Sequence, residues 1–215
     1  MNNTKFYSVI RPILKGLFRV FFHPNIKGID NLPKEKNYVL AGNHTKWLDP
    51  LMLIAVVPKQ VHFLAKDSLF KGVTKPFLKG AGAIPVNRKI HDHQALDSAI
   101  KALNEGDVIG IFPEGTINRE KKTPTLPFKI GAVKMANTTS RLIVPFVITG
   151  KYKLFSSKIT IEFLAPRKIS DNLDKENQKL REEIDKKLED YYECNQSNKT
   201  KDDSELIGGI PFLHG

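Results

Sequence analysis

From residue 37 onward, the hydrophobic pattern of the chain switches repeatedly between the period of a strand and that of a helix. Apolar runs typical of strands cover residues 37–42, 61–65, 107–112 and 141–150, and residues 158–163 alternate as an edge strand would. A further short strand is expected within the small-residue stretch 79–88. Proline has no N–H to donate to a ladder, so Pro145 predicts an edge, a bulge or a strand end.

Helices are predicted between these strands. Helical spacing of apolar residues covers 51–57, 91–106, 128–136 and 172–193. Strands that alternate with helices in this way favour an α/β fold. We therefore expect a single α/β domain at residues 25–194, with a mainly parallel or mixed sheet flanked by helices, followed by a C-terminal tail at residues 195–215.

Residues 1–24 have a different pattern, that of an N-terminal amphipathic helix. Arg11, Lys15 and Arg19 recur every four residues and form one polar stripe, while apolar side chains cover the rest of the helix. No uncharged run reaches the roughly 18 apolar residues that a membrane-spanning helix needs. Pro12 is expected to kink or divide the helix. The pattern suits a helix that lies on a membrane surface, or one that docks on the protein's own core with its charges in water.

Composition narrows the class of partner. Lys and Arg number 34 against 23 Asp and Glu, and this formal net charge of +11 predicts an anionic partner: nucleic acid, an acidic membrane surface or a phosphorylated substrate. A groove-reading motif is absent, which argues against nucleic acid. The single cysteine, Cys194, excludes an internal disulfide and a C-x-x-C motif. Because neither zinc-ligand spacing nor a nucleotide-binding glycine motif is present, we expect no metal and no cofactor.

The stretch AGNHTKWLDP at residues 41–50 carries the first candidate for chemistry. A strand leads into His44, and a helix is expected after Asp49, which suits an N-cap, and Pro50, which suits the first turn. Residues five apart on one helix point away from each other, so His44 and Asp49 can meet only if residues 45–48 form a turn. A carboxylate would then fix the imidazole tautomer and leave the other nitrogen free to take a proton. The alternative is a simple cap beside an ordinary loop histidine.

Other candidates follow predicted strands, where open α/β sheets bind ligands. In GIFPEGT, Gly115 permits close backbone approach, while Glu114 either faces a ligand or accepts backbone N–H groups and braces its loop. In AIPVNRK, Arg88 can hold a phosphate with two hydrogen bonds or remain a solvated surface residue. The absence of a G-x-S-x-G motif argues against a serine hydrolase.

Taken in order, these motifs resemble the glycerolipid acyltransferase family, whose best-known members make phosphatidic acid from lysophosphatidic acid. NHTKWLDP is similar to its N-H-x-x-x-x-D block. The stretch from FLAKDSLF through GAIPVNRK is similar to its second block, FPEGT to its third and IVPF to its fourth. Each block alone is weak, but four in this order are specific. Two departures stand out: Ile117 and Asn118 precede Arg119, where the family commonly has Arg directly after FPEGT, and Asn87 replaces an often acidic residue.

The resemblance implies transfer of a fatty acyl group from acyl-CoA or acyl carrier protein to the sn-2 hydroxyl of 1-acyl-glycerol 3-phosphate. It implies that His44 is the general base and that Asp49 orients it. It assigns the acceptor phosphate to Arg88 with Lys66, and the acceptor pocket to Glu114, Gly115 and Thr116.

It also implies a peripheral or monotopic protein on the cytoplasmic face of the cell membrane, in contact with anionic lipids through residues 1–24. Two alternatives remain open. One is an acyltransferase of the same family that uses another lysophospholipid or glycerol 3-phosphate. The other is a non-catalytic basic protein that binds membranes or nucleic acid.

Overall fold

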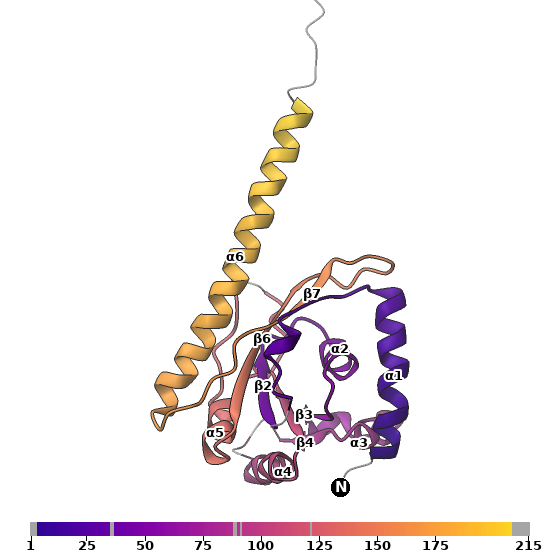
Figure 1. Ribbon diagram of the computed structural model, residues 1–215, viewed down its shortest axis with the longest axis vertical. Coiled ribbons are helices and arrows are strands. Elements are labelled where there is room, and N and C mark those ends of the chain that lie inside the picture. The colour runs from indigo at the N-terminus through magenta and orange to yellow at the C-terminus, as the bar shows by residue number, and fades with distance from the viewer. Residues whose placement is uncertain (1–3, 35–36, 88–89, 91, 121, 208–215) are drawn as a thin grey trace, which may run out of the picture.

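The computed structural model describes residues 4–34, 37–87, 90, 92–120 and 122–207, with side chains between residues 5 and 195 (Figure 1). Its centre is a seven-stranded sheet in the order β1-β7-β6-β2-β5-β3-β4. All neighbouring strands are parallel except β6 and β7. The strands are β1 (Asn25–Lys27), β2 (Tyr38–Gly42), β3 (Val61–Lys66), β4 (Ile84–Val86), β5 (Val108–Ile111), β6 (Leu142–Gly150) and β7 (Ile159–Phe163). The predicted α/β domain with a mixed sheet is confirmed.

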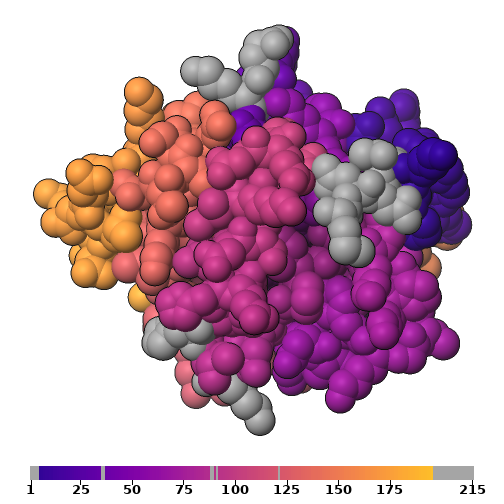
Figure 2. Space-filling model, turned by 90° about the horizontal axis from the view of Figure 1, so that it is seen from below, coloured from indigo at the N-terminus to yellow at the C-terminus, as the bar shows by residue number. Residues whose placement is uncertain are grey.

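Helices cover both faces of this sheet (Figure 1). They are α1 (Thr4–Phe21), α2 (Asp49–Val56), α3 (Thr74–Gly80), α4 (His93–Asn104), α5 (Gly131–Thr138) and α6 (Leu173–Ile207), with short 3-10 helices at Ile29–Asn31 and Asp67–Leu69. One core cluster joins α1 and α2 to the sheet through residues such as Leu40, and the other joins α4, α5 and α6 through residues such as Val39 and Ala41. Successive residues of β2 thus serve opposite cores, as the strand period requires. Seen from below, α1 and α6 lie on opposite sides of the body (Figure 2).

Of two sequence predictions about the sheet, the one for an edge strand is wrong, and the one for Pro145 holds toward one neighbouring strand. The strand predicted at the edge, β7, has the three-residue β1 outside it, and all of β1 is solvent-exposed. The alternation in β7 arises because Thr160 and Glu162 are half-exposed on one face. Pro145 lies inside β6 between β7 and β2. The N–H and C=O of one residue in a strand point toward the same neighbouring strand. The carbonyl of Pro145 accepts from the N–H of Leu164, just past the end of β7. The N–H that proline lacks would therefore face β7 where the pairing of β6 with β7 ends.

The helices also differ in extent from the prediction. α5 begins at Gly131, α3 was not predicted, and α6 continues to Ile207, past residue 193, so that it projects beyond the body (Figure 1). The residues expected to form a C-terminal tail therefore begin within a helix. Pro12 does not divide α1, which runs through it as one element.

The N-terminal helix α1 docks on the protein's own core, which was one of its two predicted alternatives, and leaves a second apolar side exposed. Its inner side packs on the core through Tyr7, Leu14 and Phe18. Arg11, predicted in the polar stripe, is half-buried and donates from Nε to the carbonyl of Val57 at 3.0 Å. A second apolar side remains in solvent, formed by Val9, Ile13, Leu17 and Val20. Among the helices that the structure describes, none contains a stretch long and apolar enough to cross a bilayer.

Candidate active site

The turn after β2 brings His44 and Asp49 together. His44 Nδ1 lies 2.9 Å from Asp49 Oδ2, and the carboxylate is fully buried while the histidine is partly exposed. Asp49 is not the N-cap that the sequence predicted, since Leu48 takes that position. Its side chain turns back instead and accepts backbone N–H groups from Thr45 at 2.6 Å and Lys46 at 2.8 Å, which fixes the turn around the carboxylate.

Two hydroxyl groups complete the environment of Asp49. Tyr152 donates to Asp49 Oδ1 at 2.7 Å, and Thr45 Oγ1 donates to the same oxygen at 3.0 Å. Burial, together with the charge of Asp49, raises the pKa of Tyr152 far above its usual range, so the phenol stays a neutral donor. An ionised carboxylate has no proton to donate, so it accepts from His44 Nδ1–H. The other ring nitrogen, Nε2, is then the basic atom available to a substrate.

A cavity of about 680 Å³ opens beside His44. The ring of His44 stacks on Phe112 with centroids 4.1 Å apart, and both residues line the cavity. Its lining is mainly apolar and comes from the strands β3, β4 and β5, the helices α4 and α5 and the loops beside them. A cavity of this size and lining suits a lipid-like ligand.

Two lysines bring positive charge to this cavity, and sequence reasoning missed both. Lys129, just before α5, and Lys134, within α5, line it in a stretch where the sequence indicated only a helix. Lys129 lies against Gly115, which has a φ of +70°. A Cβ added at Gly115 would lie 3.2 Å from Lys129 Cε and 3.3 Å from Nζ. Glycine at this position therefore permits both the left-handed backbone and the close approach of the lysine.

Glu114 takes the bracing role that was its alternative. It is buried and is not among the residues that line the cavity. Its Oε1 accepts from the backbone N–H of His44 at 2.9 Å, and its Oε2 accepts from that of Leu126 at 2.8 Å. Burial raises the pKa of Glu114, although the two backbone N–H groups oppose this shift. Glu114 thus connects the loop after β5 to the turn that holds His44.

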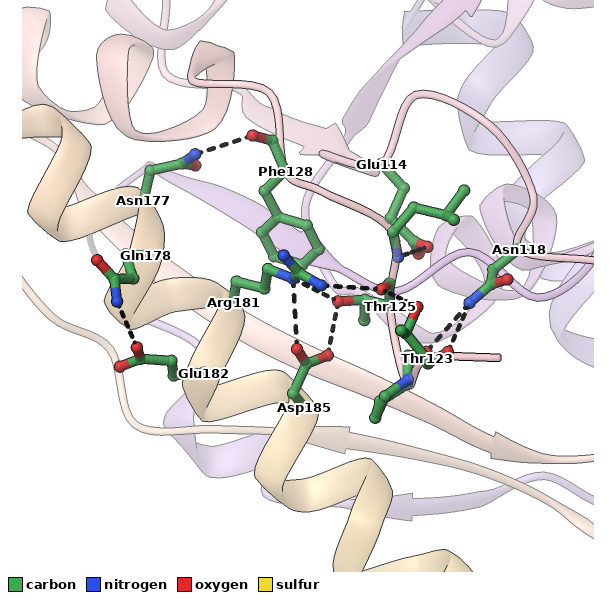
Figure 3. A network of polar contacts seen from close by, with 12 residues as sticks. Glu114, Asn118, Thr123, Thr125, Phe128, Asn177, Gln178, Arg181, Glu182 and Asp185 are labelled. Atoms are coloured by element: carbon green, nitrogen blue, oxygen red, sulfur yellow. Dashed lines mark hydrogen bonds and ion pairs between the residues drawn. The ribbon is translucent and has the colours of Figure 1, made fainter. Parts of the chain in front are cut away.

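The loop at residues 112–130 is also anchored to α6 (Figure 3). Thr125 is fully buried and donates from Oγ1 to Asp185 Oδ1 at 2.6 Å. Arg181 donates to the carbonyl of Thr125 at 3.2 Å, and Asn177 donates to the carbonyl of Phe128 at 2.9 Å. The loop is therefore held on one side by α6 and on the other by His44.

Two further predicted residues do not line the cavity. Lys66 at the end of β3 and Thr116 are both exposed, and neither is among its lining residues. Arg88 lies outside the described residues, so its role stays a prediction. In the part of the chain that the structure describes, no three His, Cys, Asp or Glu side chains are close enough together to hold a metal ion.

Comparison with known proteins identifies a sequence family that matches this chain. Residues 23–149 match the family described as Acyltransferase. The chain is similar to 1-acyl-sn-glycerol-3-phosphate acyltransferases from Bacillus subtilis, at 36% identity over 123 residues (56% of this chain, 60% of that protein), and Borreliella burgdorferi, at 38% over 140 residues (62% and 54%). The matched region thus spans little more than half the length of these relatives.

A solved structure shows the same fold. The crystal structure of the 1-acyl-sn-glycerophosphate (LPA) acyltransferase PlsC from Thermotoga maritima superposes with a TM-score of 0.69 at 20% sequence identity. The match covers 88% of this chain and 79% of that protein.

Proposed function

The chain belongs to the acyltransferase family, and on that basis we propose that it transfers a fatty acyl group from a thioester to the sn-2 hydroxyl of 1-acyl-glycerol 3-phosphate, forming phosphatidic acid. The donor is acyl-CoA or acyl carrier protein. The observation that carries this proposal is the His44 imidazole, held by the buried Asp49 at the wall of an apolar cavity. The names of the similar bacterial proteins support the choice of acceptor.

His44 acts as general base in the proposed mechanism. An alcohol is a weak nucleophile, and a positioned base that removes its proton contributes roughly 10²–10⁴-fold. Nε2 takes the proton as the hydroxyl oxygen attacks the thioester carbonyl. Asp49 orients the ring and stabilises the imidazolium that forms. When the carbon–sulfur bond breaks, the imidazolium returns the proton to the thiolate, so the products are an ester and a thiol.

The cavity supplies both parts of an amphipathic substrate site. Its apolar walls suit an acyl chain, and Lys129 and Lys134 suit an anionic group. Gly115 lines the same cavity, next to Lys129. Arg88 and Lys66 stay proposed for the acceptor phosphate and Thr116 for its surroundings, whereas the contacts of Glu114 favour a role in holding the loop.

We place the protein at the cytoplasmic face of the cell membrane, as a peripheral or monotopic protein. Support comes from α1, where Val9, Ile13, Leu17 and Val20 are 46–61% exposed. The helix carries basic residues and no acidic ones. An apolar surface beside basic side chains suits the headgroup region of an anionic leaflet.

The test is acyl transfer by the purified protein, with lysophosphatidic acid and each donor in turn. The His44→Ala variant is compared with His23→Asn, a matched control at an exposed histidine whose positive φ asparagine tolerates. Wild type and the control should form phosphatidic acid, and His44→Ala should form almost none. Product from glycerol 3-phosphate or another lysophospholipid alone would instead indicate a different acceptor within the family. Full activity of His44→Ala would contradict the mechanism.

A further inference from the structure

The loop between β6 and β7, residues 151–158, presents two large apolar side chains to solvent. Leu154 is 58% exposed and Phe155 is 70% exposed. Lys151, Lys153 and Lys158 flank them and are also exposed, and the loop contains no acidic residue. Two large apolar side chains exposed together at the tip of a basic loop indicate a contact with something other than water.

Phe155 is held in this position against its backbone preference. Its φ is +54°, in the left-handed region that bulky side chains rarely adopt. The backbone N–H of Phe155 donates to the carbonyl of Phe21 at the end of α1, and the two rings lie 5.6 Å apart. Strain of this kind persists where the surrounding structure enforces it, and it is frequent at functional sites.

The loop tip continues the exposed apolar side of α1. Phe21 lies one helical turn after Leu17, which belongs to the exposed set on that helix. Figure 1 shows the loop reaching from β7 toward the C-terminal end of α1. The exposed apolar side chains of the helix and of the loop tip are here called the apolar ridge: Val9, Ile13, Leu17, Val20, Leu154 and Phe155.

The same loop also reaches the proposed catalytic pair. Tyr152 donates to Asp49 Oδ1 at 2.7 Å, and its ring packs edge-on against Phe22 at 5.6 Å. Only one residue separates Tyr152 from Leu154. A partner that contacts the ridge would therefore lie close, along the chain, to the residue that holds Asp49.

We propose that the tip of the β6–β7 loop is a second lipid-contacting element, which enters the surface of an anionic bilayer together with α1. The proposal rests on the membrane placement given under Proposed function and adds a new surface to it. The titratable side chains of α1 and of residues 151–158 include Lys5, Arg11, Lys15, Arg19, Lys151, Lys153 and Lys158, with no carboxylate. Such a surface attracts anionic headgroups and repels a second copy of itself.

The direct test places a fluorescent reporter at the tip of the full chain. In a Trp47→Phe background, which removes the one native tryptophan, the Phe155→Trp variant is mixed with vesicles of phosphatidylcholine and phosphatidylglycerol. Its emission should shift to the blue, and added salt should reverse the shift. The matched control is Tyr192→Trp on α6, an exposed aromatic position away from the ridge, where no shift is expected.

A second variant separates lipid contact from folding. Glycine is comfortable at positive φ, so Phe155→Gly relieves strain while it removes the ring. Affinity for the mixed vesicles should fall by about tenfold, as expected for one buried aromatic side chain, and the melting temperature should stay close to that of wild type. An unchanged affinity, or a melting temperature that falls without loss of affinity, would show that the ring only packs on Phe21.

The failures can be told apart. Vesicle binding without a blue shift at the tip would overturn this inference and leave α1 as the membrane contact. Absence of binding to the mixed vesicles would overturn both membrane proposals but not acyl transfer. A blue shift that appears without vesicles as the protein dimerises would assign the ridge to a second copy of the chain.

Discussion

Two loops that follow parallel strands contribute to the cavity, and they are held in different ways. The turn at residues 43–48 is organised by its own neighbour, because Asp49 accepts from Thr45, Lys46 and His44. The loop at residues 112–130 is organised from a distance, by α6 through Thr125 and by His44 through Glu114.

The two loops therefore have different proposed roles, one in the chemical step and the other in positioning the substrate. The short turn contains the proposed base and the carboxylate that orients it. The long loop contains Gly115 and Lys129, which line the cavity, and its anchor on α6 lies beyond the family match, which ends at residue 149. We therefore expect changes in the turn to abolish the chemical step, and changes in the anchor to weaken substrate binding and stability.

The largest effect is expected from His44→Ala. Removal of the proposed base should lower kcat by up to about 10⁴-fold, the upper end of what general-base catalysis provides. The side chain stacks on Phe112 and contacts Asp49, so a moderate fall in melting temperature is expected as well. Steady-state kinetics and thermal unfolding measure the two quantities. A loss confined to KM would show that His44 only binds substrate.

Asp49→Asn should have the next largest effect. The amide places an N–H₂ group among donors, so His44 loses its fixed orientation, and kcat should lose much of the roughly 10²–10⁴-fold that general-base catalysis supplies. The buried site also loses charged hydrogen bonds, which should lower the free energy of unfolding by about 2–3 kcal/mol. Activity and denaturant unfolding are measured together. Wild-type kcat in this variant would remove Asp49 from the mechanism.

Thr125→Val tests the anchored loop. The change keeps the shape of the side chain but leaves Asp185 and Arg181 without the hydroxyl, which should cost about 1–3 kcal/mol of stability. We expect KM to rise about tenfold, with kcat less affected. Thr125→Ser retains the hydroxyl and should restore KM. If kcat falls as far as in Asp49→Asn, the contrast between the two loops is wrong.

The smallest expected effect is a change of folding stability with pH that comes from Glu114, the residue that connects the two loops. Burial raises the pKa of Glu114, so the folded state binds a proton more readily than the unfolded state does. As the pH rises from the unfolded pKa of about 4.5 through the raised value, wild type should lose stability from this group.

Glu114→Gln provides the comparison, because it cannot titrate. The stability difference between wild type and this variant should shrink as the pH rises through that interval. Urea unfolding at a series of pH values measures it. A difference that grows with pH would mean that the two backbone N–H groups outweigh burial at Glu114.

The same difference between local and distant contacts explains which parts of the fold and of the site could be predicted from the sequence. The proximity of His44 and Asp49 was predictable because one short turn brings them together. The strands β2, β5 and β6 were predictable because each is a run of apolar residues. Tyr152 and Asp185 carried no such signal, since their partners lie 103 and 60 residues away. Lys129 was hidden within a helical pattern, and β1 is too short and too exposed to show a period.

A double-mutant cycle on the turn tests the central claim most directly. It compares kcat for acyl transfer by wild type, His44→Ala, Asp49→Asn and the double variant. If Asp49 acts only through the His44 imidazole, the double variant should be no slower than His44→Ala alone. Losses that multiply would contradict the account, because Asp49 would then serve the reaction independently of His44.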